Sequence, residues 1–365
     1  MRYLYYCNSP YQLFNVINLN WQRKFKNFEN IDNYQADLII LNAFNGASEI
    51  VNILSNEDMF SNVYLSNRIK NTNRLHRIST FLDFVFSKRY IGKVLKKNYK
   101  DFKNKYDYLE MPKVSPLMLT MWLLNKNARI QLYEEGFDSY QSGKHMCYEK
   151  NSHEWIYSLK NSGKKLINNY DSIYLNKKSL YLGDDIDKVI EIPTIDDKCL
   201  DKMNSLFSSL LFDDPNKNFI WVGQYLVDGA NTITENELKK YEDDVIYIPH
   251  PRYKERQINS FNKIESNKFW ELNISIIKDI ENKCFITMHS TAAFSPKIVL
   301  NKEPFLILTL NMIQDEKNKI GLNEVNKIVE RISKEYKDQS KIMLPKNEKE
   351  LRACIETYLS KTNLV

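Results

Sequence analysis

Several residue types that mark familiar protein classes are scarce in this chain of 365 residues. Only 9 glycines and 5 cysteines occur, and no apolar run approaches the ~20 residues that a membrane span needs. The cysteines are odd in number and far apart, which argues against a disulfide framework or a Cys-x-x-Cys metal site. The apolar stretch after Met1 is too short for the core of a signal peptide. We therefore expect a cytoplasmic protein, with peripheral attachment to the inner face of the membrane left open.

The motifs of the best-known enzyme classes are also absent. The sequence holds no P-loop, no GxGxxG, no HExxH and no GxSxG. A DxD pattern, which can hold a divalent metal, occurs at Asp185 to Asp187, but it lies in a polar turn. Turn chemistry is the more common reason for such acids. We expect neither a metal nor a cofactor.

The charge balance is mildly basic, with 52 Lys and Arg against 46 Asp and Glu and a net charge of +6. Lysines gather between Lys88 and Lys105, in a segment whose pattern over 73–99 predicts a long helix. Such a face suits anionic lipid or an acidic substrate, although a solvated lysine face is more common. The excess is too small to indicate nucleic acid, and no basic motif interleaves with aromatic residues.

Short apolar strands alternate with helical patterns along most of the chain, which predicts parallel sheets covered on both faces. The length exceeds what one core usually serves, so we expect two Rossmann-like domains, 1–170 and 171–345, and a closing helix, 346–365. The first set of strands is 2–7, 37–41, 63–65, 106–109 and 129–133. The second is 172–175, 188–192, 219–222, 245–248, 284–288 and 305–310. Expected helices include 117–124, 234–241, 269–281, 321–336 and 347–360.

The first group of candidate site residues follows the opening strand. Ser9 is a good N-cap and Pro10 suits the first helical position. Asn8, Ser9 and Gln12 would therefore lie at a helix N-terminus, where free N–H groups can meet an anion or a sugar hydroxyl. An ordinary strand–helix connection explains these residues at least as well.

An acidic pair follows the strand 129–133. Glu134 and Glu135 are neighbours on an extended segment, so their side chains point to opposite sides and only one is expected to face substrate. A carboxylate there can act as a general base toward a sugar hydroxyl. Gly136 permits a sharp turn and leaves room for a ligand. Ordinary loop chemistry is the alternative.

A histidine between two prolines ends the strand 245–248. Pro249 and Pro251 restrict the backbone on either side of His250. The carboxyl end of a strand is where open α/β sheets bind ligands, and an imidazole with Arg252 nearby suits a phosphate. A histidine that merely caps the strand is the alternative.

The remaining candidate site residues follow two further strands. Gly223 and Gln224 follow the strand 219–222, and the glycine would allow a nucleotide to approach closely. Ser290 and Thr291 follow the strand 284–288, where hydroxyl and backbone N–H groups make a phosphate cradle. Ser290 or Thr291 could equally be only the N-cap of the following helix.

Taken in chain order, four of these motifs resemble those of the bacterial sialyltransferases, most closely glycosyltransferase family 52. They are the strand followed by Ser-Pro-Tyr-Gln, the acidic-acidic-Gly triplet, the His-Pro pair and the Ser-Thr pair. The resemblance runs from Tyr3 to about Phe294. No one motif is specific, but their order and their division between two halves are those of the family, which contains lipooligosaccharide and capsule sialyltransferases.

The resemblance implies a GT-B fold, with two parallel-sheet domains facing across a cleft. It implies an inverting, metal-independent transfer of sialic acid from CMP-sialic acid to a terminal galactose-type hydroxyl of a bacterial surface glycan. Glu134 would be the general base, His250 would neutralise or protonate the departing CMP phosphate, and Ser290 and Thr291 would hold that phosphate. The family triplet often contains aspartate, so Glu-Glu leaves open which acid acts.

Two other functions fit the same residues. A GT-B glycosyltransferase with another nucleotide-sugar donor is one, and a non-catalytic carbohydrate- or nucleotide-binding protein is the other. The acceptor glycan, the α2,3 or α2,6 linkage and the formation of a homodimer stay open.

Overall fold

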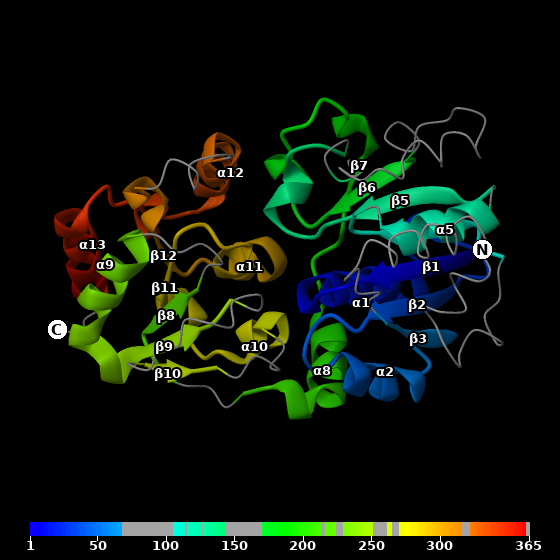
Figure 1. Ribbon diagram of the computed structural model, residues 1–365, viewed down its shortest axis with the longest axis horizontal. Coiled ribbons are helices and arrows are strands. Elements are labelled where there is room, and N and C mark those ends of the chain that lie inside the picture. The colour runs from blue at the N-terminus through cyan, green and yellow to red at the C-terminus, as the bar shows by residue number, and fades with distance from the viewer. Residues whose placement is uncertain are drawn as a thin grey trace, which may run out of the picture. The chain divides into compact units, whose positions relative to one another are not determined.

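The computed structural model describes residues 1–67, 105–113, 115–125, 127–143, 146, 170–212, 216–223, 229–250, 261–264, 270–314 and 322–362. The chain divides into two compact units, Met1–Pro193 and Thr194–Val365. Each unit is built on a parallel β-sheet (Figure 1). The expectation of two parallel-sheet α/β domains is confirmed.

The sheet of the first unit has seven described strands in the order β3-β2-β1-β4-β5-β6-β7, and every neighbouring pair is parallel. The central strand is buried from Tyr3 to Cys7, because helices and loops cover both faces. The strands are β1 (Arg2–Cys7), β2 (Gln35–Leu41), β3 (Asn62–Ser66), β4 (Tyr108–Met111), β5 (Arg129–Tyr133), β6 (Ser172–Leu175) and β7 (Val189–Glu191). The described α-helices are α1 (Pro10–Phe25), α2 (Ala47–Ser55) and α5 (Pro116–Leu124).

The sheet of the second unit has six described strands in the order β10-β9-β8-β11-β12-β13, again all parallel. They are β8 (Phe219–Val222), β9 (Val245–Ile248), β10 (Asn262–Lys263), β11 (Cys284–Thr287), β12 (Phe305–Leu308) and β13 (Ile342–Met343). The helices are α8 (Asp197–Leu206), α9 (Gly229–Leu238), α10 (Trp270–Ile276), α11 (Thr291–Leu300), α12 (Leu322–Glu335) and α13 (Glu348–Lys361).

The boundary between the units differs from the expected one. We expected it at 170, with the strands 172–175 and 188–192 in the second domain. The structure pairs β6 with β5 and β7 with β6, so both strands extend the first sheet and the boundary lies at Pro193. Local pattern identified the strands, but sheet membership depends on pairing with residues far away in the sequence.

The closing helix belongs to the core of the second unit. Leu351, Ile355 and Tyr358 of α13 are at most 1% exposed and pack in the same apolar cluster as strands β8 and β11. The Tyr358 hydroxyl donates to the carbonyls of Asn218 and Asn282, at 3.2 and 3.0 Å. Helix α13, expected as a separate closing segment, is therefore an integral part of the second unit.

Several local expectations need smaller corrections. Helices α2 and α8 and the short strands β10 and β13 were not anticipated, and β4 begins two residues later than expected. Helix α9 starts at Gly229 and ends at Leu238, several residues earlier than the expected 234–241. The expected basic helix over 73–99 lies outside the described residues, as do Gln224, Pro251 and Arg252.

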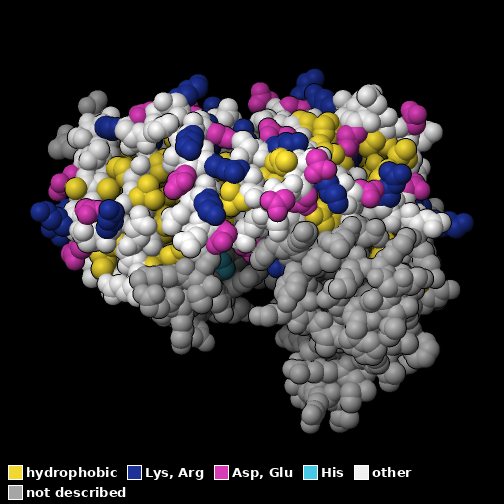
Figure 2. Space-filling view, turned by 90° about the horizontal axis from the view of Figure 1, so that it is seen from above, with side chains coloured by type: hydrophobic (Ala, Val, Ile, Leu, Met, Phe, Trp, Pro, Cys, Tyr) yellow, Lys and Arg dark blue, Asp and Glu magenta, His cyan; other side chains and the backbone are white. Residues whose placement is uncertain are grey.

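Basic and acidic side chains are interspersed on the face of the described surface that Figure 2 presents. On that face the mild positive charge of the chain is therefore not gathered into one patch. None of the helices in the described part of the chain is both long and apolar enough to cross a membrane.

Candidate functional site

Candidate residues of the first unit meet at the carboxyl edge of its sheet. Strand β1 ends at Cys7 and β5 at Tyr133, and parallel strands bring these ends to the same edge. The Glu134 N–H donates to the Tyr174 carbonyl at 3.0 Å, which extends the β5–β6 pairing by one residue. The start of α1 and the acidic pair (Glu134 and Glu135) therefore lie at the same edge of the sheet.

The start of α1 is capped by its own side chains. Ser9 is the N-cap, and its hydroxyl accepts from the Gln12 N–H at 3.3 Å. The Gln12 side-chain oxygen accepts from the Asn8 N–H at 2.8 Å. This reciprocal arrangement is close to a capping box, in which the residue three positions after the cap reaches back. The Ser9 and Gln12 side chains therefore accept hydrogen bonds from backbone N–H groups at the start of the helix. This is the arrangement of an ordinary strand–helix connection.

The Glu134 carboxylate is completely buried and accepts four hydrogen bonds. Tyr11 on α1 donates to Oε1. Oε2 accepts from the Tyr140 hydroxyl at 2.6 Å, from the Asn176 N–H at 2.8 Å and from Asn176 Nδ2 at 2.9 Å. The Glu134 carbonyl accepts from Asn15 Nδ2 at 3.1 Å. Sequence reasoning did not select Tyr11, Tyr140 or Asn176.

Two opposing effects set the pKa of the Glu134 carboxyl. Burial disfavours the charged form and is the largest effect, so the pKa is raised above its ordinary value. The hydrogen bonds from Tyr11, Tyr140 and Asn176 favour the carboxylate and limit that rise.

The second acid of the pair has a different environment. The Glu135 side chain is half-buried, and its N–H donates to the Ser139 hydroxyl at 2.8 Å. Gly136 follows at φ 136° and ψ −158°, a conformation that side chains disfavour, and starts the 3₁₀ turn Phe137–Tyr140. The chain therefore enters a 3₁₀ turn two residues after Glu135.

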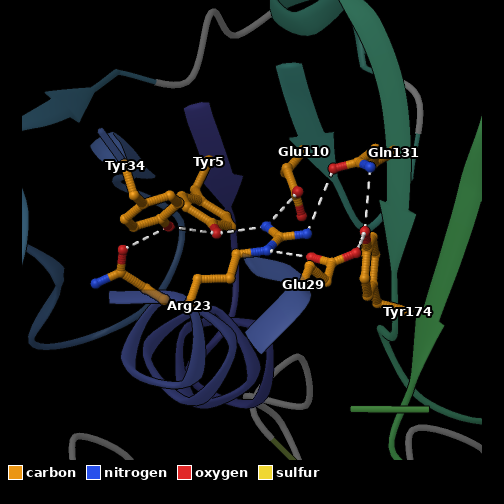
Figure 3. Close-up of polar contacts among 8 residues, drawn as sticks. Tyr5, Arg23, Glu29, Tyr34, Glu110, Gln131 and Tyr174 are labelled. Carbon is orange, nitrogen blue, oxygen red and sulfur yellow. Dashed lines mark hydrogen bonds and ion pairs between the residues drawn. The ribbon is translucent and has the colours of Figure 1, made fainter. Parts of the chain in front are cut away.

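A buried arginine near the C-terminal end of α1 was also not anticipated (Figure 3). The Arg23 side chain is 0% exposed and forms ion pairs with Glu110 at 2.5 Å and Glu29 at 2.8 Å. Its guanidinium lies 4.7 Å from the ring centroids of both Tyr3 and Tyr174. These contacts join α1 to strands β1, β4 and β6. They fix the helix whose first two turns carry Tyr11 and Asn15.

The candidates of the second unit also share a carboxyl edge. Gly223 follows β8, His250 comes two residues after β9, and Ser290 comes three residues after β11. These three strands are adjacent and parallel, in the order β9-β8-β11. The sheet topology therefore brings Gly223, His250 and Ser290 to one edge of the sheet.

Ser290 lies directly before the helix that follows β11. It is the N-cap of α11, yet its hydroxyl makes no capping hydrogen bond to that helix. Its N–H donates to the Thr287 hydroxyl at 3.3 Å. Nearby, Trp270 Nε1 donates to the Ala292 carbonyl at 3.0 Å, which ties α10 to the first turn of α11. The helix start is thus fixed while the Ser290 hydroxyl is not used as a cap.

The structure gives a packing reason for glycine at position 223, which the sequence did not indicate. A Cβ at this position would lie 2.6 Å from the Tyr247 hydroxyl and 3.0 Å from the Ile248 carbonyl. The glycine N–H donates to that carbonyl at 2.8 Å. Close packing against β9 accounts for the glycine without invoking a nucleotide.

One of the two DxD acids, Asp185, has hydrogen-bond partners in the structure. Asp185 accepts hydrogen bonds from the hydroxyls of Tyr170 and Tyr181. In the part of the chain that the structure describes, no three His, Cys, Asp or Glu side chains are close enough together to hold a metal ion.

No protein-family model matches the chain, and no curated protein matches its sequence. The structure is similar to the spinosyn rhamnosyltransferase SpnG, with TM-score 0.47 and 10% identity, covering 99% of this chain and 91% of that one. It is similar to the UDP-GlcNAc 2-epimerase of Methanocaldococcus jannaschii in complex with UDP-GlcNAc and UDP, with TM-score 0.49 and 12% identity, covering 98% and 93%. It is also similar to the E. coli heptosyltransferase WaaC with ADP, with TM-score 0.41 and 9% identity, covering 99% and 100%. At these TM-scores the likenesses carry no inference about what this chain binds or does.

Proposed function

We propose that the protein is a glycosyltransferase with a nucleotide-sugar donor, and within that class an inverting, metal-independent sialyltransferase that uses CMP-sialic acid. Its acceptor would be a terminal galactose-type hydroxyl of a bacterial surface glycan. The observation that carries the proposal is the position of His250 and Ser290, which follow strands β9 and β11 at the same carboxyl edge of the second sheet. That edge is where open α/β sheets bind ligands.

The second unit would bind the donor. The leaving group is the anionic phosphate of CMP, so groups that donate protons or carry positive charge stabilise the charge that develops in the transition state. His250 is suited to neutralise or protonate this phosphate. The Ser290 hydroxyl, Thr291 and the amino end of α11 add further donors, because a helix start presents free N–H groups.

The first unit would activate the acceptor. A sugar hydroxyl is a poor nucleophile until its proton is removed, and the acidic pair supplies a carboxylate for that step. The acceptor oxygen forms a bond to the anomeric carbon of sialic acid, while the bond from that carbon to the phosphate oxygen breaks and its electron pair leaves with CMP. Attack opposite to the leaving group gives inversion.

The decisive experiment is incubation with CMP-sialic acid and a panel of galactosides in the presence of EDTA, with CMP release and sialylated product measured. We expect both products, and we expect His250→Gln to lower turnover at least 100-fold. The exposed Lys239 gives a matched control, and Lys239→Gln should behave as the wild type. Transfer from a hexose nucleotide instead would move the protein to another donor class. Binding of CMP without transfer from any donor would make it a non-catalytic binding protein.

A further inference from the structure

The two acids of the pair occupy environments that suit different tasks. Glu134 is 0% exposed, and its carboxylate accepts four hydrogen bonds. An ionised carboxylate offers about four lone-pair positions, so these donors use its accepting capacity. A substrate hydroxyl could deliver its proton to Glu134 only by displacing one of them. Glu135 is half-buried and lies on the other side of the extended chain.

The donors to Glu134 come from three separate parts of the first unit. Tyr11 lies on α1, Tyr140 on the turn that follows β5, and Asn176 directly after β6. Asn176 Nδ2 also reaches Asn15 Oδ1 on α1 at 3.0 Å. The carboxylate therefore links a helix, a turn and a strand end around one point. Such a link holds the adjacent residue of the chain in one position.

The backbone on both sides of Glu135 is fixed as well. Its own N–H is held by the Ser139 hydroxyl at 2.8 Å, and Gly136 adopts a φ of 136° that favours glycine. The backbone position from which the Glu135 side chain leaves is thus set by Glu134 before it and by Gly136 after it. Preorganised groups of this kind are what proton transfer requires.

From this geometry we infer that Glu135 is the proton acceptor of the transfer reaction and that Glu134 is a buried positioning residue that holds it in place. The inference rests on the proposed function and assigns the two roles within the acidic pair. In the step itself, the acceptor O–H proton passes to the Glu135 carboxylate as the new glycosidic bond forms. Glu135 then returns the proton to water.

Isosteric amides separate the two roles. Gln at position 134 preserves the shape, because its carbonyl can face Asn176 and Tyr140 while its amide donates to the Tyr11 hydroxyl. Glu134→Gln should therefore keep turnover within about tenfold of wild type, together with the acid limb of the pH–rate profile. Glu135→Gln should lower kcat by roughly 10²–10⁴-fold and abolish that limb, with an unchanged melting temperature.

Stability measurements test the positioning role independently of any substrate. Glu134→Ala leaves the Tyr11, Tyr140 and Asn176 donors buried without their acceptor, so the melting temperature should fall by roughly 5 °C or more. Glu135→Ala should change it by about 2 °C or less, because the side chain reaches solvent. Asp138→Asn, an exposed acid in the next turn, is the matched control for both assays.

The possible outcomes distinguish this inference from the function on which it rests. Turnover lost in Glu134→Gln as completely as in Glu135→Gln, with both variants folded, overturns the division of roles. Full turnover in Glu135→Gln does the same. A wild type that transfers sugar from no nucleotide donor refutes the proposed function and the role of Glu135 with it. An unaltered melting temperature in Glu134→Ala refutes the positioning role alone.

Discussion

A guanidinium buried between two tyrosine rings and two carboxylates depends on each of these partners. Arg23 has this environment, with Glu110 at 2.5 Å and Glu29 at 2.8 Å, and its side chain is 0% exposed. Glu110 is 0% exposed too, and burial raises its pKa to about 7 although the Arg23 charge opposes the rise. Buried pairs of this kind are not by themselves strong sources of stability, but removing one partner is costly.

Replacing Arg23 therefore gives a clear prediction. Arg23→Met should lower the free energy of unfolding by about 3 kcal/mol, because it leaves Glu110 buried without its cation. The double variant Arg23→Met/Glu110→Leu should recover at least half of that loss, since an apolar pair needs no compensation. Urea denaturation followed by circular dichroism measures both. A single variant within about 0.5 kcal/mol of wild type would contradict the prediction.

Glu271, in the second unit, should make the stability of the protein depend on pH. It lies in the first turn of α10, is 6% exposed, and its Oε2 has no hydrogen-bond partner among the described residues. Burial raises its pKa to about 7 from the ordinary 4.5. The folded state thus favours the neutral acid, and the stability linked to this group is fully present below pH 4.5. That stability is lost as the pH rises toward 7, by about 1.4 kcal/mol for each pH unit.

Substitution by the neutral isostere should remove this dependence. Glu271→Gln should be more stable than wild type at pH 8, by roughly 1–3 kcal/mol, and no more stable at pH 4.5. Thermal melts across this pH range measure the difference. Parallel stability curves for the two proteins would show that Glu271 is not held neutral in the folded state.

At the scale of elements, the start of α1 shows a polar side chain, Ser9, that caps a helix by accepting a backbone hydrogen bond. Ser9 accepts from the Gln12 N–H, and Gln12 in turn accepts from the Asn8 N–H. The same helix carries Tyr11 and Asn15 to the acidic pair and Arg23 to the sheet. The correct start of α1 therefore determines where its polar residues lie along the sheet.

Two substitutions at the cap separate the structural role of Ser9 from a binding role. Ser9→Ala should cost about 1 kcal/mol of stability, because one helix-end donor loses its acceptor. Ser9→Asp should retain stability, since aspartate caps equally well. Neither should alter KM for the donor or the acceptor more than about twofold, as measured alongside thermal melts. A large rise in KM for Ser9→Ala at unchanged stability would return Ser9 to the binding site.

On the scale of the whole molecule, each unit has its own parallel sheet and its own core. The second unit contains the strand ends followed by Gly223, His250 and Ser290, whereas the acidic pair belongs to the first. The proposed reaction therefore divides its tasks between the units, with donor binding in one and acceptor activation in the other.

This division predicts where a bound nucleotide slows amide hydrogen exchange. CMP alone should protect peptides of the second unit, around 245–250 and 287–294, and leave peptides of the first unit unchanged. Hydrogen exchange followed by mass spectrometry, with His250→Gln as the comparison, makes the measurement. Protection centred on Met1–Pro193 would reverse the assignment of the two units.

Local sequence determined the features that depend on neighbouring residues. The β-branched and aromatic runs identified β1, β5, β8 and β9 within a residue or so, and the Ser-Pro pair identified the first residue of α1. Parallel topology then followed from the alternation of strands and helices, and with it the expectation that strand ends meet at one edge. These inferences hold because backbone preferences and side-chain periodicity act over short distances along the chain.

Only the tertiary structure decided which of two adjacent glutamates is buried and what surrounds it. Tyr11 reaches Glu134 across 123 positions of sequence and Asn176 across 42, and Arg23 meets Glu110 across 87. The same holds for the boundary at Pro193, which depends on β6 and β7 joining the first sheet. Such contacts have no local signature, because burial and hydrogen-bond partners are set by which distant segments pack together.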